Sequence, residues 1–194
     1  SENGHAEVVS MLLAKEDINV NQPKDDGATP LFLASQNGHG KVVSMLLAKQ
    51  GVNVNQAEED GATPLFIASQ EGHAEVVSLL LAKQGVDVNQ AENDGGTPLC
   101  VASESGHAEV VAMLLAKQGV DVNQAMNNGQ TPLYIASYLG RAEVVKMLLA
   151  KQGVDVNQAR DSGATPLLMA SAKGNAVVVS MLLAKQGVDV NQAK

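Results

Sequence analysis

The tripeptide Thr-Pro-Leu recurs along this chain every 34 residues, and this fixed interval limits the possible folds. The threonines are Thr29, Thr63, Thr97, Thr131 and Thr165. The segment Val-Asn-Gln recurs in phase, and a period of this size is typical of a solenoid. We therefore expect a single repeat domain over residues 1–194, with a partial unit at 1–22 and five full units starting near residues 29, 63, 97, 131 and 165.

Each unit contains the signals of two short helices. Thr63 is a suitable N-cap, Pro64 fits the first helical position, and Gly72 is a suitable terminator. The second helix should follow His73 and end near Gly85. Its apolar stripe consists of Val76, Val77, Leu80 and Leu81.

The segment between units has the pattern of an extended, hairpin-like connection. Val86 to Asn89 alternate apolar and polar residues, and Asp94-Gly95 is a strong turn signal. Neither helix buries its stripe alone, so neighbouring units must stack. The chain has no Trp, two Tyr and two Phe, and such a composition suits thin layers of small side chains. The sequence predicts an all-α solenoid of stacked helix-turn-helix units joined by β-hairpin-like turns.

The stretch Asp60–Gln90, DGATPLFIASQEGHAEVVSLLLAKQGVDVNQ, resembles an ankyrin repeat in its TPL, GH, VVxLLL and DVN elements. Five units carry the pattern. The tetratricopeptide family shares the 34-residue period, but its aromatic helix signature is absent here. The resemblance implies a protein-binding module that uses a concave strip of turn tips and first helices.

The units depart from the usual ankyrin pattern in two ways. Ankyrin units usually have 33 residues, and the extra residue falls within Leu81–Gly85, which leaves the superhelical twist open. The usual His after Thr-Pro-Leu is also missing, so we expect some hydrogen bonding between repeats to differ. The residues at that position are Phe32, Phe66, Cys100, Tyr134 and Leu168.

Charge and composition argue against several classes of partner. The net charge of −8 opposes binding to nucleic acid, which requires clustered Lys and Arg. No apolar run reaches the roughly 18 residues of a membrane span. The single cysteine, Cys100, cannot form a disulfide within the chain, which fits an intracellular compartment better than secretion.

The sequence predicts neither a cofactor nor an enzyme. His5, His39, His73 and His107 occupy equivalent positions in successive units, so they stand a layer apart and cannot converge on one metal ion. We expect them to support the loop between the two helices. Cys100 is the best candidate nucleophile, but its apolar surroundings favour packing.

Positions that vary between units mark the candidate binding surface. They lie at the turn tips, before each threonine and at the end of the first helix. Apolar side chains at Tyr138 and Leu139 should lie exposed beside Met126 and form an interface anchor. The alternative is that they pack differently within this unit alone or contact an adjacent array. The predicted partner-binding residues are Met126, Asn127, Asn128, Gln130, Tyr138, Leu139, Glu104, Glu92, Asn93, Glu59, Arg160 and Lys173.

The predicted function is recognition of a partner protein or peptide. The first three tips are acidic, so this partner is expected to be basic. A structural spacer within a longer array is the alternative, which the abrupt ends favour. The last helix has Val177-Val178-Val179 where terminal units normally carry polar caps, and this predicts a fragment or end-to-end self-association.

Overall fold

The computed structural model describes residues 1–192, and within them the ordered secondary structure is entirely helical. The helices are α1 (Ala6–Leu13), α2 (Pro30–Gln36), α3 (Gly40–Ala48), α4 (Pro64–Glu71), α5 (Ala74–Ala82), α6 (Pro98–Ser105), α7 (Ala108–Ala116), α8 (Pro132–Tyr138), α9 (Ala142–Ala150), α10 (Pro166–Ala172) and α11 (Ala176–Ala184). The prediction of an all-α solenoid is confirmed.

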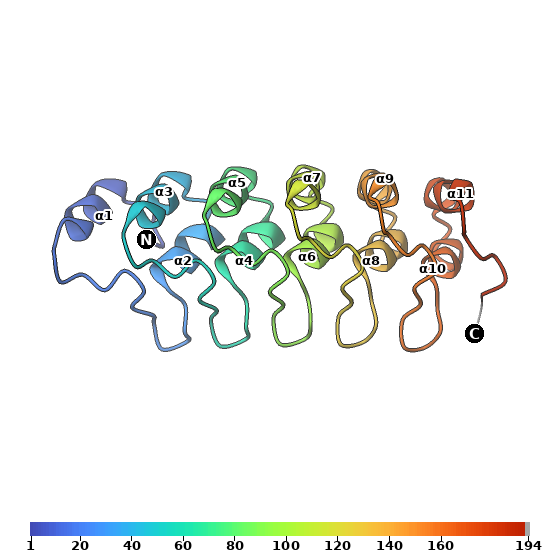
Figure 1. Ribbon diagram of the computed structural model, residues 1–194, viewed down its shortest axis with the longest axis horizontal. Coiled ribbons are helices and arrows are strands. Elements are labelled where there is room, and N and C mark those ends of the chain that lie inside the picture. The colour runs from blue at the N-terminus through green and yellow to red at the C-terminus, as the bar shows by residue number, and fades with distance from the viewer. Residues whose placement is uncertain (193–194) are drawn as a thin grey trace.

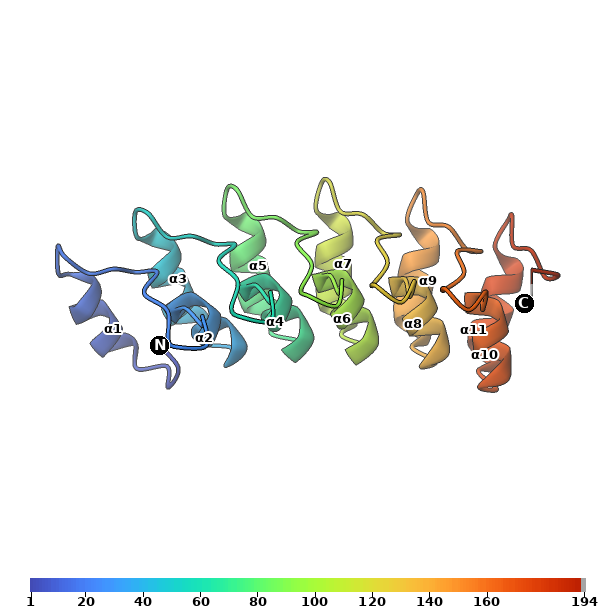
Figure 2. The same cartoon turned by 90° about the horizontal axis from the view of Figure 1, so that it is seen from below.

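The helices form two parallel rows. The first helices of the units, α2, α4, α6, α8 and α10, pack side by side, and the second helices, from α1 to α11, form the other row. Figure 1 shows these rows one above the other, with the turn tips projecting along one side. Figure 2 shows the same units from below, in a line that rises and falls only slightly.

Each first helix begins at its threonine, as predicted. The Thr63 Oγ1 accepts a hydrogen bond from the Phe66 N–H at 3.1 Å, and Pro64 occupies the first turn, where a missing N–H has no cost. The helix α4 ends at Gly72, whose φ of 76° is left-handed. The threonine N-cap and the following proline recur in all five full units, whereas the left-handed glycine C-cap occurs only in α4 and α6.

Each second helix ends earlier than predicted. The helix α5 ends at Ala82 instead of near Gly85, because Lys83 adopts an extended conformation (φ −74°, ψ 132°). The Lys83 Nζ donates to the carbonyl oxygen of Leu47, in the last turn of α3, at 2.6 Å. A cation at a helix C-terminus donates to an otherwise unpaired carbonyl and interacts favourably with the negative end of the helix dipole. The segment that carries the extra residue thus also holds the lysine that caps the preceding unit.

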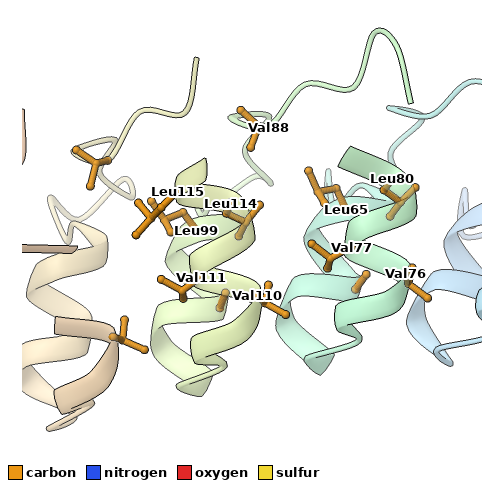
Figure 3. Packing of buried hydrophobic residues seen from close by; sticks show 14 of the residues in the cluster. Leu65, Val76, Val77, Leu80, Val88, Leu99, Val110, Val111, Leu114 and Leu115 are labelled. Carbon is orange, nitrogen blue, oxygen red and sulfur yellow. The ribbon is translucent and has the colours of Figure 1, made fainter. Parts of the chain in front are cut away.

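One apolar core runs along the whole array between the two rows. Figure 3 shows it in two neighbouring units, where Leu65, Val76, Val77 and Leu80 are equivalent to Leu99, Val110, Val111 and Leu114. These side chains are at most 1% exposed. Each layer is closed by the next one, so the units depend on their neighbours for burial.

Asparagines join consecutive units along the edge of the array. The Asn55 Nδ2 donates to the Gly85 carbonyl at 2.7 Å, and the Asn55 Oδ1 accepts the Asp87 N–H at 2.9 Å. Asn21, Asn89, Asn123 and Asn157 make the equivalent pair of bonds. The recurrent Val-Asn-Gln segment therefore supplies the junction between each unit and the following one.

The turn tips are hairpin-like in their hydrogen bonds. The Glu58 N–H donates to the Ala62 carbonyl at 3.1 Å across one tip, and the Asn93 N–H donates to the Asp60 carbonyl of the neighbouring tip at 2.9 Å. No β-strand occurs within residues 1–192. The tips thus form a continuous row of hydrogen-bonded turns.

Candidate functional site

The turn tips are held in shape by acidic or amide side chains. In the third full unit, the Glu92 carboxylate accepts the Asp94 N–H at 2.7 Å and the Gly96 N–H at 2.9 Å. Glu58 makes the same two contacts in the preceding tip. Glu92 is half-buried, so this predicted contact residue also has a structural role.

Side-chain amides link three consecutive tips. The Asn127 Nδ2 donates to the Asn93 carbonyl at 2.9 Å, and the Asn93 Nδ2 donates to the Glu59 carbonyl at 3.2 Å. Asn93, Asn127 and Glu59 are all exposed, so their remaining polar atoms face solvent. In the fourth tip, Asn128 holds Gln130 by an amide contact at 3.3 Å and by its Oδ1, which accepts the Gln130 N–H at 3.0 Å. The tips therefore form one fixed edge.

Tyr138 and Met126 lie together in a second apolar cluster. Both pack, with Met169, against a buried group that contains Tyr134 and Ile135. The Lys173 Nζ lies 4.6 Å from the centre of the Tyr138 ring, within the range of a cation–π contact. Tyr138 is half-buried instead of freely exposed, because the fifth unit covers part of its ring.

Leu139 caps the C-terminus of α8 and is 40% exposed, as the sequence predicts. It does not belong to the cluster around Tyr138. Arg160, on the fifth tip, lies with its guanidinium carbon 5.9 Å from the centre of the Tyr134 ring. Glu104 is exposed near the end of α6, and its carbonyl accepts a hydrogen bond from Arg141 at 3.1 Å. The structure thus places Lys173 on the Tyr138 ring, and it places Met126 against the same buried cluster as Tyr138.

A groove between the tips and first helices of the first full units was not predicted. It has a volume of about 450 Å³, and its apolar lining includes Phe32, Leu33, Phe66 and Ile67. The acidic residues Glu2, Asp26, Glu58, Asp60 and Glu92 also line the groove. The two successive phenylalanines at this position, Phe32 and Phe66, were the sequence signal for this feature; the later units have Cys100, Tyr134 and Leu168 there.

The histidines connect units instead of supporting only their own loop. The His73 Nε2 lies 2.9 Å from the Gln36 carbonyl, and the His107 Nε2 lies 3.0 Å from the Gln70 carbonyl. Each ring thus donates to the end of the preceding first helix. Within residues 1–192, the His, Cys, Asp and Glu side chains form no group of three suited to a metal ion.

Cys100 is buried, with 1% of its surface exposed, and packs in the cluster with Tyr134. Burial raises the pKa of its thiol, and the hydrogen bonds with Thr97 only partly oppose this effect. A nucleophilic cysteine needs an accessible thiolate. The surroundings of Cys100 are therefore those of a packing residue.

A family model of ankyrin repeats in sets of three copies matches residues 1–58, 47–125, 84–160 and 118–194, which together cover the chain. The chain belongs to the ankyrin repeat family. Ankyrin repeats are generally protein–protein interaction modules. A search of curated proteins finds no match to this ankyrin array. None of its helices in residues 1–192 has both the length and the apolar character needed to cross a bilayer.

Proposed function

We propose that this ankyrin array binds a partner protein or peptide through the surface formed by its turn tips and first helices. The observation that carries the proposal is that this surface holds both an open groove, in the first units, and the Tyr138 cluster, in the fourth and fifth units. Both combine partly exposed apolar side chains with charged ones, as protein interfaces do. The predicted contact residues from Glu59 to Lys173 extend along the same tips and helix ends.

The Tyr138 cluster is the proposed anchor of this surface. An aromatic side chain that contacts Lys173 and packs against a buried cluster loses little conformational freedom on binding, and aromatic residues dominate the energetics of interfaces. Leu139 adds exposed apolar area next to it. Substitution of these residues should therefore weaken binding much more than substitution of the exposed tip amides.

Affinity capture from a cell lysate tests the proposal. The bait is compared with a variant that carries Met126→Lys, Tyr138→Ala and Leu139→Lys. The control variant carries Ala112→Lys and Ala116→Lys, which add the same two positive charges at exposed positions of α7. Circular dichroism first establishes that all three proteins are folded.

A partner captured by the wild-type and control baits but lost by the Tyr138 variant would support the proposal. A partner retained by all three baits would place the binding site elsewhere. Capture of nothing by any bait would favour the alternative function, a structural spacer. In that case the regular junctions between units would be the main feature under selection.

We further propose that the array associates end to end through its two end faces. Met11 and Leu12 of α1 are 64% and 51% exposed, and Val177 and Leu183 of α11 are 60% and 50% exposed. Exposed apolar side chains in contiguous groups favour association. Sedimentation equilibrium should show dimers and longer oligomers that increase with concentration and are lost in a Met11→Lys variant, whereas a monomer at all concentrations would refute this proposal.

A further inference from the structure

The groove in the N-terminal half of the array combines an apolar floor with an acidic rim. Its floor consists mainly of Phe32, Leu33, Phe66 and Ile67, from α2 and α4. Phe66 and Ile67 are 7% and 8% exposed, so each presents only a small apolar area to the groove. Such a floor suits small or aliphatic side chains that lie along the surface.

The rim carries more negative charge than the array itself neutralises. Among residues 1–192, Lys24 is the one cation that lines the groove, and its Nζ lies 4.0 Å from an Asp26 carboxylate oxygen. Glu2, Glu58, Asp60 and Glu92 also line the groove, and within residues 1–192 none of them has a cation within 4.0 Å. Carboxylates held near apolar surface attract cationic groups over several ångströms.

The carboxylates repeat with the units. Asp26 and Asp60 are equivalent positions of successive tips, as are Glu58 and Glu92. Stacked helical units lie roughly 8–10 Å apart. A chain in the extended polyproline II conformation advances about 3.1 Å per residue and repeats its side-chain direction every three residues, so about three of its residues span one unit.

We propose that this groove binds an extended basic segment of a partner protein, with a Lys or Arg at about every third residue and small aliphatic residues between them. The charge of the rim selects the cations, and the apolar floor receives the residues between them. Nucleic acid has the same sign of charge as the groove and would be repelled. This inference rests on the proposed function, since it names the class of partner for part of the same surface.

Binding of designed peptides tests the inference. The probe is a fluorescent peptide of about twelve residues, built from arginine-alanine-valine repeats so that it spans roughly four units. One comparison peptide has glutamate in place of arginine. Another has the same composition with all arginines at one end, and fluorescence anisotropy measures the affinity of each.

We expect the periodic basic peptide to bind most tightly and to weaken as salt concentration rises. Equal binding of the periodic and clustered basic peptides would overturn the spacing part of the inference. Binding of the acidic peptide as tightly as the basic one would overturn the inference as a whole.

Variants of the array locate the binding. The groove variant carries Glu2→Gln, Asp60→Asn, Gln36→Lys and Gln70→Lys, all at exposed side chains. It leaves intact Glu58 and Glu92, which hold the tips. The control variant makes matching charge changes at exposed positions outside the groove lining, with Glu75→Gln, Glu109→Gln, Gln84→Lys and Gln118→Lys.

Each lost or opposed charge should weaken peptide binding about twofold to fivefold, so the groove variant should bind the peptide about tenfold more weakly or worse. The control variant should bind nearly as the wild type does. Equal weakening in both variants would mean attraction by net charge alone and would overturn the inference. Failure of the peptide to bind while lysate capture still depends on Tyr138 would refute only the basic-segment inference and leave the proposed function standing.

Discussion

At the scale of single residues, this repeat uses buried side chains that differ from unit to unit at one position. The residue two places after each proline is Phe32, Phe66, Cys100, Tyr134 or Leu168. Cys100 is the smallest of the four that are buried, and its Sγ lies 3.6 Å from the Gln124 carbonyl. In four units this position therefore holds a buried side chain of different volume, whereas Leu168 in the last unit is 38% exposed.

The buried thiol of Cys100 makes stability depend on pH. Burial raises its pKa, so the folded state keeps its proton at a pH where the unfolded chain has lost it. The stabilisation is complete below the unfolded pKa of about 8.5 and is lost as the pH rises through the folded value. Urea unfolding at neutral and alkaline pH should show a steeper loss of stability in the wild type than in Cys100→Ala. Parallel pH profiles of the two proteins would contradict this prediction.

At the scale of helices and turns, the start of each first helix could be predicted because its signals are local. Thr63, Pro64 and Gly72 act within their own turn of backbone. The bond from Lys83 to Leu47 joins residues 36 positions apart, and the two bonds of Asn55 join it to residues of the next unit. A repeat period identifies equivalent positions, but it does not say which side chain reaches the neighbouring unit.

The candidate site was predictable to a similar extent. Variation between units pointed to the tips and to Tyr138, and exposure of Leu139 was predicted from its place after the helix. The contact of Lys173 with the Tyr138 ring depends on stacking between units, as does the groove over Phe32 and Phe66. These features need the distance between units, which sequence alone does not contain.

Substitution of two glycines with similar backbone angles distinguishes the cost of backbone strain from the cost of close packing in the turns. Gly95 has a φ of 83° and Gly119 a φ of 86°. A Cβ at Gly95 would lie 2.8 Å from the backbone nitrogen of Asn127, whereas one at Gly119 would meet no atom within 4 Å. Gly119→Ala should lower the free energy of unfolding by about 1–2 kcal/mol, from backbone strain alone. Gly95→Ala should lower it further, because two neighbouring tips must separate.

Chemical denaturation of both variants measures these losses. Both substitutions leave the charge and the hydrogen-bond donors unchanged, so the two losses of stability can be compared directly. Equal losses of unfolding free energy in the two variants would show that neighbouring tips move apart to accommodate a methyl group with no loss of stability. That outcome would contradict the fixed edge described above.

At the scale of the whole molecule, stability is shared between neighbours and not centred on one core. The helix α5 packs against α3, α4 and α7, whereas α1 packs mainly against α3, and α11 against α9 and α10. Middle units are thus covered on both sides. In a linear array of this kind, opening begins where neighbours are fewest.

Hydrogen exchange should follow this arrangement. We expect amide protons of α4 to α8 to exchange most slowly, and those of α1 and α11 to exchange most rapidly, with a gradual change between them. Mass spectrometry of exchanged peptides measures the gradient. Uniform protection from α1 to α11 would indicate that the array opens in a single step and would contradict the prediction.

The asparagine junctions have a consequence for how such a protein changes over generations. Asn21, Asn55, Asn89, Asn123 and Asn157 each make the same two bonds to the unit that follows. When a coding segment for one whole unit is duplicated or deleted, the units that become neighbours can therefore form the same two asparagine bonds. No compensating substitution is required. Recombination can lengthen or shorten the recognition surface in steps of one unit, while point mutations at the tips diversify what each step recognises.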